Sequence, residues 1–408
     1  MNERAKTLRP LSGTLIILIN FLPVMAIASM TASMPVMLDR FSVEPDARLL
    51  VPLMVTAPAL TIIVFGPLAG RLIDRVGRKR PLVLACLLYG FAGSAPLLLD
   101  DLTALVGSRL ILGIGEAALI TISATLIADY WDEAGRRFWL TVQGVSGPLL
   151  SSGIIAASGF LAASGWNAVF LLYLGAFPLA LACFLLLPEV APERKLRAND
   201  SKAAIRTLVP IIVPIAAVTL LASTLFYAWI VQGGLAFRAI GIESPAVQGQ
   251  IFGLAHLAVI PGALLFNLTG RFMMPRAQSA FMLAVIGVGL LLIGTADSRT
   301  GMTAGLVVEQ LAAGMCVMTL LSWAQNTLPS EVRGIGLGIW SACFFAGQLV
   351  SPLVFAALGG IERGVPERFA LLGIGGVLAA LAIGFSHLAA KACRNEAPVA
   401  ADPGDRHE

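Results

Sequence analysis

The sequence is built from long apolar runs that alternate with short, charged loops. Each run is about 18–28 residues long, which lets a helix cross a hydrocarbon layer of roughly 30 Å. In lipid, a helix is the segment that satisfies its own backbone polar groups. The runs predict twelve transmembrane helices at residues 12–38, 49–69, 82–99, 102–128, 138–163, 167–188, 207–235, 247–269, 277–295, 302–326, 334–358 and 367–390.

The charge content agrees with a membrane protein. Charged residues make up 13% of the chain, about half of the roughly 25% found in soluble domains. Most of the 28 Lys and Arg residues fall in the termini and in the loops expected on the same side of the membrane as the N-terminus. The positive-inside rule therefore predicts that both termini are cytoplasmic, and we expect the chain in a plasma membrane, the inner membrane of a bacterium.

The longest expected inner loop divides the chain into two halves. We predict an N-terminal six-helix bundle over residues 1–188, a cytoplasmic linker over 189–206, a C-terminal six-helix bundle over 207–392 and a disordered cytoplasmic tail over 393–408. A faint internal repeat supports this division, because residues 68–72 resemble 268–272, residues 109–113 resemble 310–314 and Gly147 aligns with Gly347. Such a repeat predicts two pseudo-symmetric bundles with the substrate site between them, near the middle of the membrane.

Ionisable side chains inside the spans are candidate functional groups, since they are costly in lipid. Arg109 and Glu116 lie seven residues apart and share one face of the fourth expected span. We predict that Glu116 carries a proton and that Arg109 modulates it; the alternative is a fixed ion pair that holds helices together. Glu309 in the tenth span is a second candidate for proton coupling, and a polar cap near the outer mouth is its alternative.

Polar and aromatic side chains inside the spans are candidates for a substrate cavity. His256 can titrate near neutral pH, although a histidine held by one hydrogen bond is the alternative. The aromatic side chains have packing or the membrane interface as their alternative role. The candidate cavity residues are Asn20, Gln143, Tyr227, Gln232, His256, Gln310, Trp323, Trp340 and Phe344.

Motifs of soluble enzymes are absent from the sequence. There is no phosphate-binding GxxxxGK[ST] loop, no HExxH pair and no array of Cys and His, so we expect no enzyme activity, no cofactor and no metal site. The excess of positive charge is explained by membrane orientation, so we expect no nucleic-acid partner. We expect a monomer.

The loop after the second expected span carries a resemblance to a known family. Residues 70–80 read Gly-Arg-Leu-Ile-Asp-Arg-Val-Gly-Arg-Lys-Arg. This stretch resembles the signature loop of the major facilitator superfamily, which lies between spans two and three. The resemblance implies a fold of twelve helices in two six-helix bundles.

Two further stretches resemble motifs of the same family. Arg109 and Gly113 stand as in its span-four motif, although Leu112 replaces the usual polar residue. Gly147 and Pro148 resemble the Gly-Pro motif of the drug:proton antiporters, but the spacing from Gly144 is one residue short. We assign Gly113, Gly147 and Pro148 to helix packing.

The resemblance also implies a cytoplasmic latch that biases the transport cycle. Asp74 would face the start of span eleven, where the helix dipole favours an anion. Arg78 would pair with Asp129 at the end of span four. The latch residues are Gly70, Asp74, Arg75, Gly77, Arg78 and Asp129.

The resemblance implies a secondary transporter that works by alternating access. The group it resembles most, the twelve-span drug:proton antiporters, implies proton-coupled efflux of a small apolar or amphiphilic compound. Proton-coupled uptake of an organic anion or other metabolite is an alternative, because residues 113–117 also resemble the span-four signature of lipid- and anion-carrying relatives. A non-transporting membrane sensor or scaffold is the alternative from another class. The expected partners are a small-molecule substrate, protons and membrane lipids.

Overall fold

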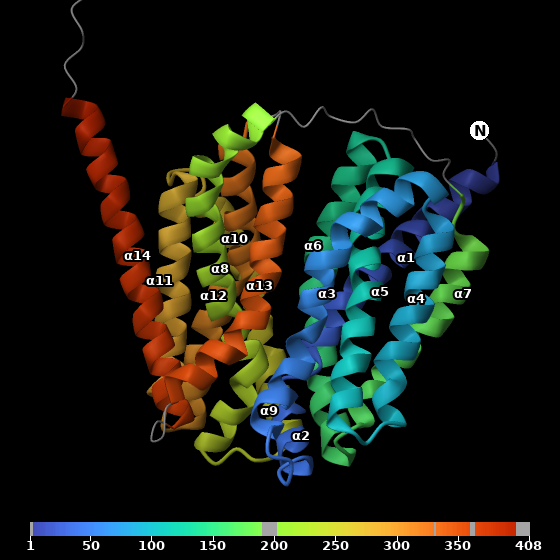
Figure 1. The fold of residues 1–408 in the computed structure, drawn as a ribbon, viewed down its shortest axis with the longest axis horizontal. Helices are drawn as coiled ribbons and strands as arrows, with labels where there is room; N and C mark the ends of the chain where they lie inside the picture. Colours follow the sequence, from blue (N-terminus) through green and yellow to red (C-terminus); the bar gives the residue numbers. More distant parts are fainter. Residues whose placement is uncertain (1–2, 190–201, 330–331, 360–363, 397–408) are drawn as a thin grey trace, which may run out of the picture.

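All regular secondary structure in the described part of the chain is helical (Figure 1). The computed structural model describes residues 3–189, 202–329, 332–359 and 364–396. Within these ranges it leaves aside the side chains of residues 3–9, 70–75, 124, 128, 137, 202–207, 334 and 386–396.

The helices of the N-terminal half share one buried apolar core, in which Ile16, Tyr89 and Phe170 are fully enclosed. Two tyrosines fix the first helix there: the Tyr89 hydroxyl donates to the Leu22 carbonyl at 2.7 Å and the Tyr173 hydroxyl to the Ala26 carbonyl at 3.2 Å. The elements are α1 (Glu3–Ala28), α2 (Met34–Arg40), α3 (Ala47–Val76), α4 (Lys79–Ser94), η1 (Ala95–Leu97), α5 (Leu102–Tyr130), α6 (Glu133–Ser164), η2 (Ala168–Gly175) and α7 (Ala176–Leu186).

The C-terminal half has a second core, which includes Trp229, Met282 and Phe369. Its helices pack closely where glycines allow it, as where Gly287 of α11 faces Gly373 of α14. The elements are α8 (Lys202–Ala239), α9 (Pro245–His256), α10 (Val259–Thr269), α11 (Pro275–Gly294), α12 (Arg299–Thr327), α13 (Arg333–Gly359) and α14 (Val365–Glu396).

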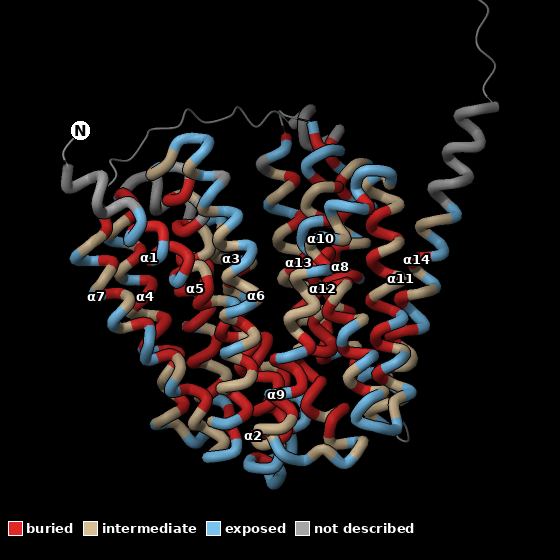
Figure 2. Tube along the Cα trace, turned by 180° about the vertical axis from the view of Figure 1, so that it is seen from behind, coloured by how far each residue is buried: buried red, intermediate tan, exposed pale blue. Residues whose placement is uncertain are grey.

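Twelve helical segments of the described chain are long and apolar enough to cross a membrane, which confirms the expected number of spans. Their outer surfaces are apolar as well: Leu84 and Phe91 are each 66% exposed. Figure 2 shows such exposed positions along the flanks of both bundles. Apolar side chains that face outward along a whole helix bundle are expected where lipid, not water, is the surrounding solvent.

Several boundaries differ from the sequence prediction. For example, α8 begins at Lys202, inside the predicted linker 189–206. The first span ends at Ala28, ten residues before its predicted end at 38, because residues 29–33 form a turn before α2. Ser33 donates to the Ser29 carbonyl in this turn, and such side-chain bonds compete with helix. The eighth span is two helices, since Pro261 cannot donate a backbone hydrogen bond and its ring conflicts with the Leu257 carbonyl. The last helix continues to Glu396, past the expected start of the tail at 393.

Candidate functional site

A cavity of about 340 Å³ lies between the two halves. It is bordered by α1, α3, α5, α6 and η2 of the first half and by α8, α9, α10, α12 and α13 of the second. Its walls are mainly apolar and aromatic, with Phe226, Phe252 and Phe344 among them. The volume falls in the range of roughly 300–1,000 Å³ that is usual for small-molecule sites.

Contacts between the halves gather at one end of this cavity. The Thr31 hydroxyl, just after α1, donates to the Ile230 carbonyl of α8 at 2.6 Å. The Ser152 hydroxyl of α6 donates to the Gly253 carbonyl of α9, also at 2.6 Å. Figure 1 shows the two bundles converging at the end that carries α2 and the start of α9, and diverging at the end where α1 begins. We call these the closed end and the open end.

An ion pair and a close glycine contact lie at the closed end. The Arg238 guanidinium at the end of α8 donates to both carboxylate oxygens of Asp39 on α2, at 2.8 and 2.6 Å. On α6, a Cβ at Gly159 would lie 2.9 Å from the Cα of Gly249 on α9, so these two helices touch backbone to backbone. The close approach depends on glycine at both positions.

Arg109 borders the cavity, yet most of its guanidinium is engaged by protein. It is 2% exposed, and its Nη2 donates to the carbonyls of Ala92 and Gly93 at 2.8 Å each. Those carbonyls belong to the last turn of α4, where the helix dipole favours a cation. The guanidinium carbon also lies 5.1 Å from the ring centres of Phe170 and Tyr173. Its Nη1 is buried without a partner among the described residues.

Glu116 also borders the cavity but has no polar partner in the described structure. It is 3% exposed, and its buried Oε1 accepts no hydrogen bond from the described residues. No ion pair to Arg109 is present in the described part of the chain. The fixed-pair alternative for these two residues therefore does not describe this conformation. Seven helical residues separate the two charges by roughly 10 Å along the axis.

In the second half, three polar side chains form a hydrogen-bonded chain. Glu309 is fully buried, and its Oε2 accepts from the Gln310 Nε2 at 2.5 Å. The Gln310 Oε1 is 2.6 Å from the His256 Nδ1. His256 and Gln310 border the cavity, whereas Glu309 lies behind them. His256 is therefore held by a hydrogen bond, as in the alternative to a titrating histidine.

The predicted cavity residues divide into two groups. Five of them border the cavity: Asn20, Tyr227, His256, Gln310 and Phe344. Four do not border it in this conformation: Gln143, Gln232, Trp323 and Trp340.

Helix geometry explains why one residue of the second group, Gln232, lies off the cavity. Gln232 follows Tyr227 by five residues on α8 and so points to a different helix face. Trp340 lies one helical turn before Phe344 on α13 and stacks against it, with ring centres 5.9 Å apart, but only Phe344 borders the cavity. Sequence reasoning missed Tyr173, which borders the cavity beside Arg109. A tyrosine inside an apolar span is the signal that could have found it, because its buried hydroxyl needs a partner.

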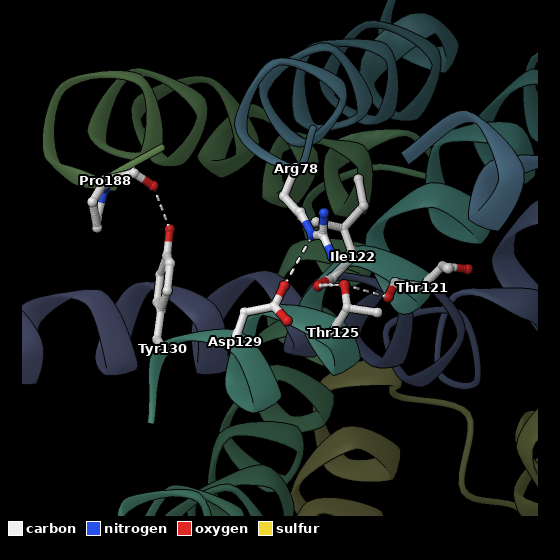
Figure 3. Close-up of polar contacts among 7 residues, drawn as sticks. All are labelled: Arg78, Thr121, Ile122, Thr125, Asp129, Tyr130 and Pro188. Atoms are coloured by element: carbon white, nitrogen blue, oxygen red, sulfur yellow. Dashed lines mark hydrogen bonds and ion pairs between the residues drawn. The ribbon is translucent and has the colours of Figure 1, made fainter. Parts of the chain in front are cut away.

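The predicted latch is partly within the described structure. Gly77 has φ +90°, a conformation that favours glycine, and it ends α3 so that α4 can begin at Lys79. The Arg78 Nε donates to the Asp129 Oδ2 at 2.9 Å, as the resemblance implied (Figure 3). The contacts of Gly70 and the side chains of Asp74 and Arg75 lie outside what the structure describes. The gating role of this loop stays a prediction.

The three predicted packing residues behave differently. A Cβ at Gly113 would lie 2.5 Å from the Pro58 carbonyl, so glycine is needed where α5 meets α3. A Cβ at Gly147 would meet nothing within 4 Å, and the packing role predicted for this glycine is not seen in this conformation. Pro148 lies inside α6, which continues through it. Among the described residues no group of three or more His, Cys, Asp or Glu could hold a metal ion.

Comparisons with known proteins agree with this architecture. The family model described as Major Facilitator Superfamily matches residues 16–352. A solved structure of a bacterial homolog of the human lysosomal transporter Spinster, inward-facing and unoccupied, matches with a TM-score of 0.68 and 16% identity, over 95% of this chain and 96% of that one. At this identity the match speaks for the fold alone.

Two curated relatives have names that refer to different compounds. The 3-(3-hydroxy-phenyl)propionate transporter of Escherichia coli (strain K12) is 27% identical, over 77% of this chain and 79% of its own. The class E tetracycline resistance protein of Escherichia coli is 24% identical, over 85% of this chain and 87% of its own. The family model covers most of the sequence, and the fold and the cavity between two bundles agree with it. The chain belongs to the Major Facilitator Superfamily of membrane transporters.

Proposed function

We propose that the chain is a proton-coupled secondary transporter that exports a small apolar or amphiphilic compound by alternating access. The observation that carries the proposal is Glu116, a buried carboxyl at the cavity wall without a polar partner among the described residues. An ionised carboxylate in an apolar site is far more costly than its protonated form. A group of this kind can take a proton in one state of the cycle and release it in another.

The apolar walls support the class of cargo. Aromatic and aliphatic side chains make up most of the cavity surface, and Asn20, Tyr227 and Gln348 add isolated polar groups. Such a site favours a compound with a large apolar body and few polar atoms. The relation to a tetracycline resistance protein is in keeping with export.

The direction of opening follows from the charge of the loops. The open end carries the start of α1 and the start of α8, and most Lys and Arg residues lie in the termini and in the loops expected on that side of the membrane. The positive-inside rule places this end in the cytoplasm. In this proposal the conformation faces inward, and the contacts at the closed end seal the outer side.

Uptake of an organic anion is the second candidate, and Arg109 favours it. The Nη1 of this buried guanidinium has no partner among the described residues, and the residue borders the cavity. A carboxylate is the natural partner for such a group. The relation to a 3-(3-hydroxy-phenyl)propionate transporter is in keeping with this candidate.

Transport in proteoliposomes under an imposed pH gradient separates the two candidates. The probes are tetracycline and 3-(3-hydroxyphenyl)propionate. An antiporter accumulates its cargo in vesicles that are acidic inside, because protons leave as the cargo enters. A symporter accumulates its cargo in vesicles that are alkaline inside.

Weak acids and bases also distribute passively across a pH gradient, so two controls are needed. Protein-free vesicles give the passive level, and vesicles with the Glu116→Gln variant give the level without the proposed proton carrier. Accumulation that is equal in all three preparations, for both probes and both gradients, would refute proton-coupled transport of these two compounds.

A further inference from the structure

The hydrogen-bonded side chains of Glu309, Gln310 and His256 connect a buried acid with the cavity. Glu309 has one oxygen bonded to Gln310 and the other, Oε1, buried without a partner among the described residues. Gln310 in turn contacts the His256 Nδ1, and both of these side chains border the cavity. Each of these three groups can act as a hydrogen-bond donor or as an acceptor, depending on where its proton lies or how its amide is turned.

Two hydrogen-bond patterns satisfy the same three side chains. In the first, Glu309 is ionised and accepts from the Gln310 amide nitrogen, while His256 donates from Nδ1 to the Gln310 oxygen. In the second, Glu309 is protonated and donates to the Gln310 oxygen, while the turned amide donates to a bare Nδ1. The ring proton of His256 is then on Nε2. The patterns differ in the orientation of one amide, which heavy-atom positions alone do not distinguish.

We propose that Glu309 is a second proton site and that its protonation sets the tautomer of His256 through Gln310. Passing from the first pattern to the second takes up one proton from the cavity water. An O–H bond forms on Glu309, and on His256 the Nδ1–H bond is replaced by an Nε2–H bond by exchange with water. The Nε2 that remains for the cargo changes from a hydrogen-bond acceptor to a donor.

The consequence is a cavity whose preference depends on proton occupancy. With Glu309 ionised, His256 favours a cargo that presents a hydroxyl or N–H group. With Glu309 protonated, it favours a cargo that presents a carbonyl or carboxylate oxygen. The role of this switch in cargo binding rests on the proposed transport function. The change of tautomer itself can be tested without transport.

The surroundings confine the change to the three side chains. A Cβ at Gly289 of α11 would lie 2.6 Å from the Glu309 backbone nitrogen, and a Cβ at Gly262 of α10 would lie 3.1 Å from the Cα of Gly314 on α12. The backbone of α12 is therefore held on two sides. On the described parts of α12 and the helices packed against it, the Cys, His, Tyr and charged groups other than Glu309 are Arg299, Cys316, Tyr227, Arg238, His256, Arg276, Arg333 and Cys343.

Two of these groups are close enough to matter. Cys316 follows Glu309 by seven residues on α12, so the two side chains share one face of that helix. His256 is the group that joins it to the cavity. The four arginines lie at helix ends: in the first turn for Arg276, Arg299 and Arg333, and in the last turn of α8 for Arg238.

Nitrogen-15 NMR of labelled histidine in nanodiscs reads the tautomer. The background carries His387→Gln and His407→Gln, so that His256 alone reports, and the spectrum is followed through a pH titration. We expect the proton of neutral His256 to move from Nδ1 at high pH to Nε2 at low pH. Glu309→Gln should abolish this movement, and Glu116→Gln should leave it unchanged.

A tautomer that stays the same through the titration would overturn the inference, as would a switch that persists in Glu309→Gln. If Glu309→Gln does not fold, Gln310→Met replaces it, because it separates the acid from the imidazole and should also abolish the switch. Loss of the switch in Glu116→Gln would assign it to the proton carrier of the proposed function, and the inference would then be wrong while proton coupling could still hold.

Discussion

The two halves of the molecule place different chemistry at matching positions. Arg109 of α5 aligns with Gln310 of α12 in the internal repeat, and both border the cavity. Glu116 aligns in the same way with Val317, which also borders the cavity. The first half thus presents a cation and an acid to the cargo, whereas the second half presents an amide and keeps its acid, Glu309, behind it.

The difference shows how two similar bundles can divide one task. In the first half Arg109 is held by backbone carbonyls and two aromatic rings, so its charge is fixed in place. Glu116 stands without a partner among the described residues and is the group free to change its charge. In the second half each side chain from Glu309 to His256 is bonded to the next. Four predictions test this division, from the largest expected effect to the smallest.

Glu116→Gln removes the group that can change its charge in the first half. We expect proton-driven transport to fall by roughly 10²-fold or more, the usual effect of removing a proton-transfer group, while exchange of cargo without a gradient is kept. Both rates are measured in proteoliposomes. Glu44→Gln, which changes an exposed acid, is the matched control. Gradient-driven transport at the normal rate in Glu116→Gln would show that Glu116 is not the proton carrier.

Arg109→Met and Gln310→Met compare the two matching positions in stability. Arg109→Met leaves the Ala92 and Gly93 carbonyls without their donor, and each unpaired buried group costs roughly 1–3 kcal/mol. For the two carbonyls, at roughly 2–4 °C per kcal/mol, the unfolding temperature should fall by about 4–24 °C, measured by tryptophan fluorescence in detergent. Gln310→Met should lower it less, because it leaves one fully buried group, Glu309, without its donor, whereas the other partner, His256, borders the cavity. Equal shifts in the two variants would show that Arg109 is not the structural anchor.

Gly159→Leu disturbs the closed end where the halves meet. The new side chain conflicts with the Gly249 backbone, and such overpacking costs roughly 1–3 kcal/mol. The population of the conformation open at this end should rise by about 5- to 150-fold. Spin-label distances between Ser42→Cys and Glu243→Cys, one on each half, measure it in a background that lacks the native cysteines. Gly147→Leu is the control, because its Cβ meets nothing within 4 Å; similar distances in both variants would count against the glycine contact.

Asp39→Asn removes the ion pair with Arg238 at the same end. The pair has two good hydrogen bonds, but Asp39 is largely exposed, with 63% of its side chain accessible. Exposed pairs contribute about 0.2–1 kcal/mol, so the same spin labels should report a shift of no more than about fivefold. The exchange Asp39→Arg with Arg238→Asp should restore the original distribution. A shift as large as that of Gly159→Leu would make the ion pair, not the helix contact, the main seal.

The sequence predicts the spans well and the cavity only in part. Hydropathy locates the twelve helices because lipid imposes one length and one composition on each. It misses the turn at residues 29–33 and the break near Pro261, because a turn of small or apolar residues does not change mean hydropathy. It places Asn20 and Phe344 at the cavity but also Gln143 and Trp340, which lie elsewhere. Membrane helices are apolar on most faces, so their hydropathy pattern does not indicate which face borders the cavity.

The charges around the cavity have a consequence for the effect of membrane voltage. Among the described residues, the acidic and basic side chains that border the cavity are Arg109 and Glu116. The formal charge of the cavity is therefore zero when Glu116 is ionised and +1 when Glu116 is protonated. A monovalent anion carried with one proton moves no net charge across the membrane. An uncharged cargo exchanged for one proton moves one charge, and voltage then adds about 2.3 kcal/mol per 100 mV to the driving force.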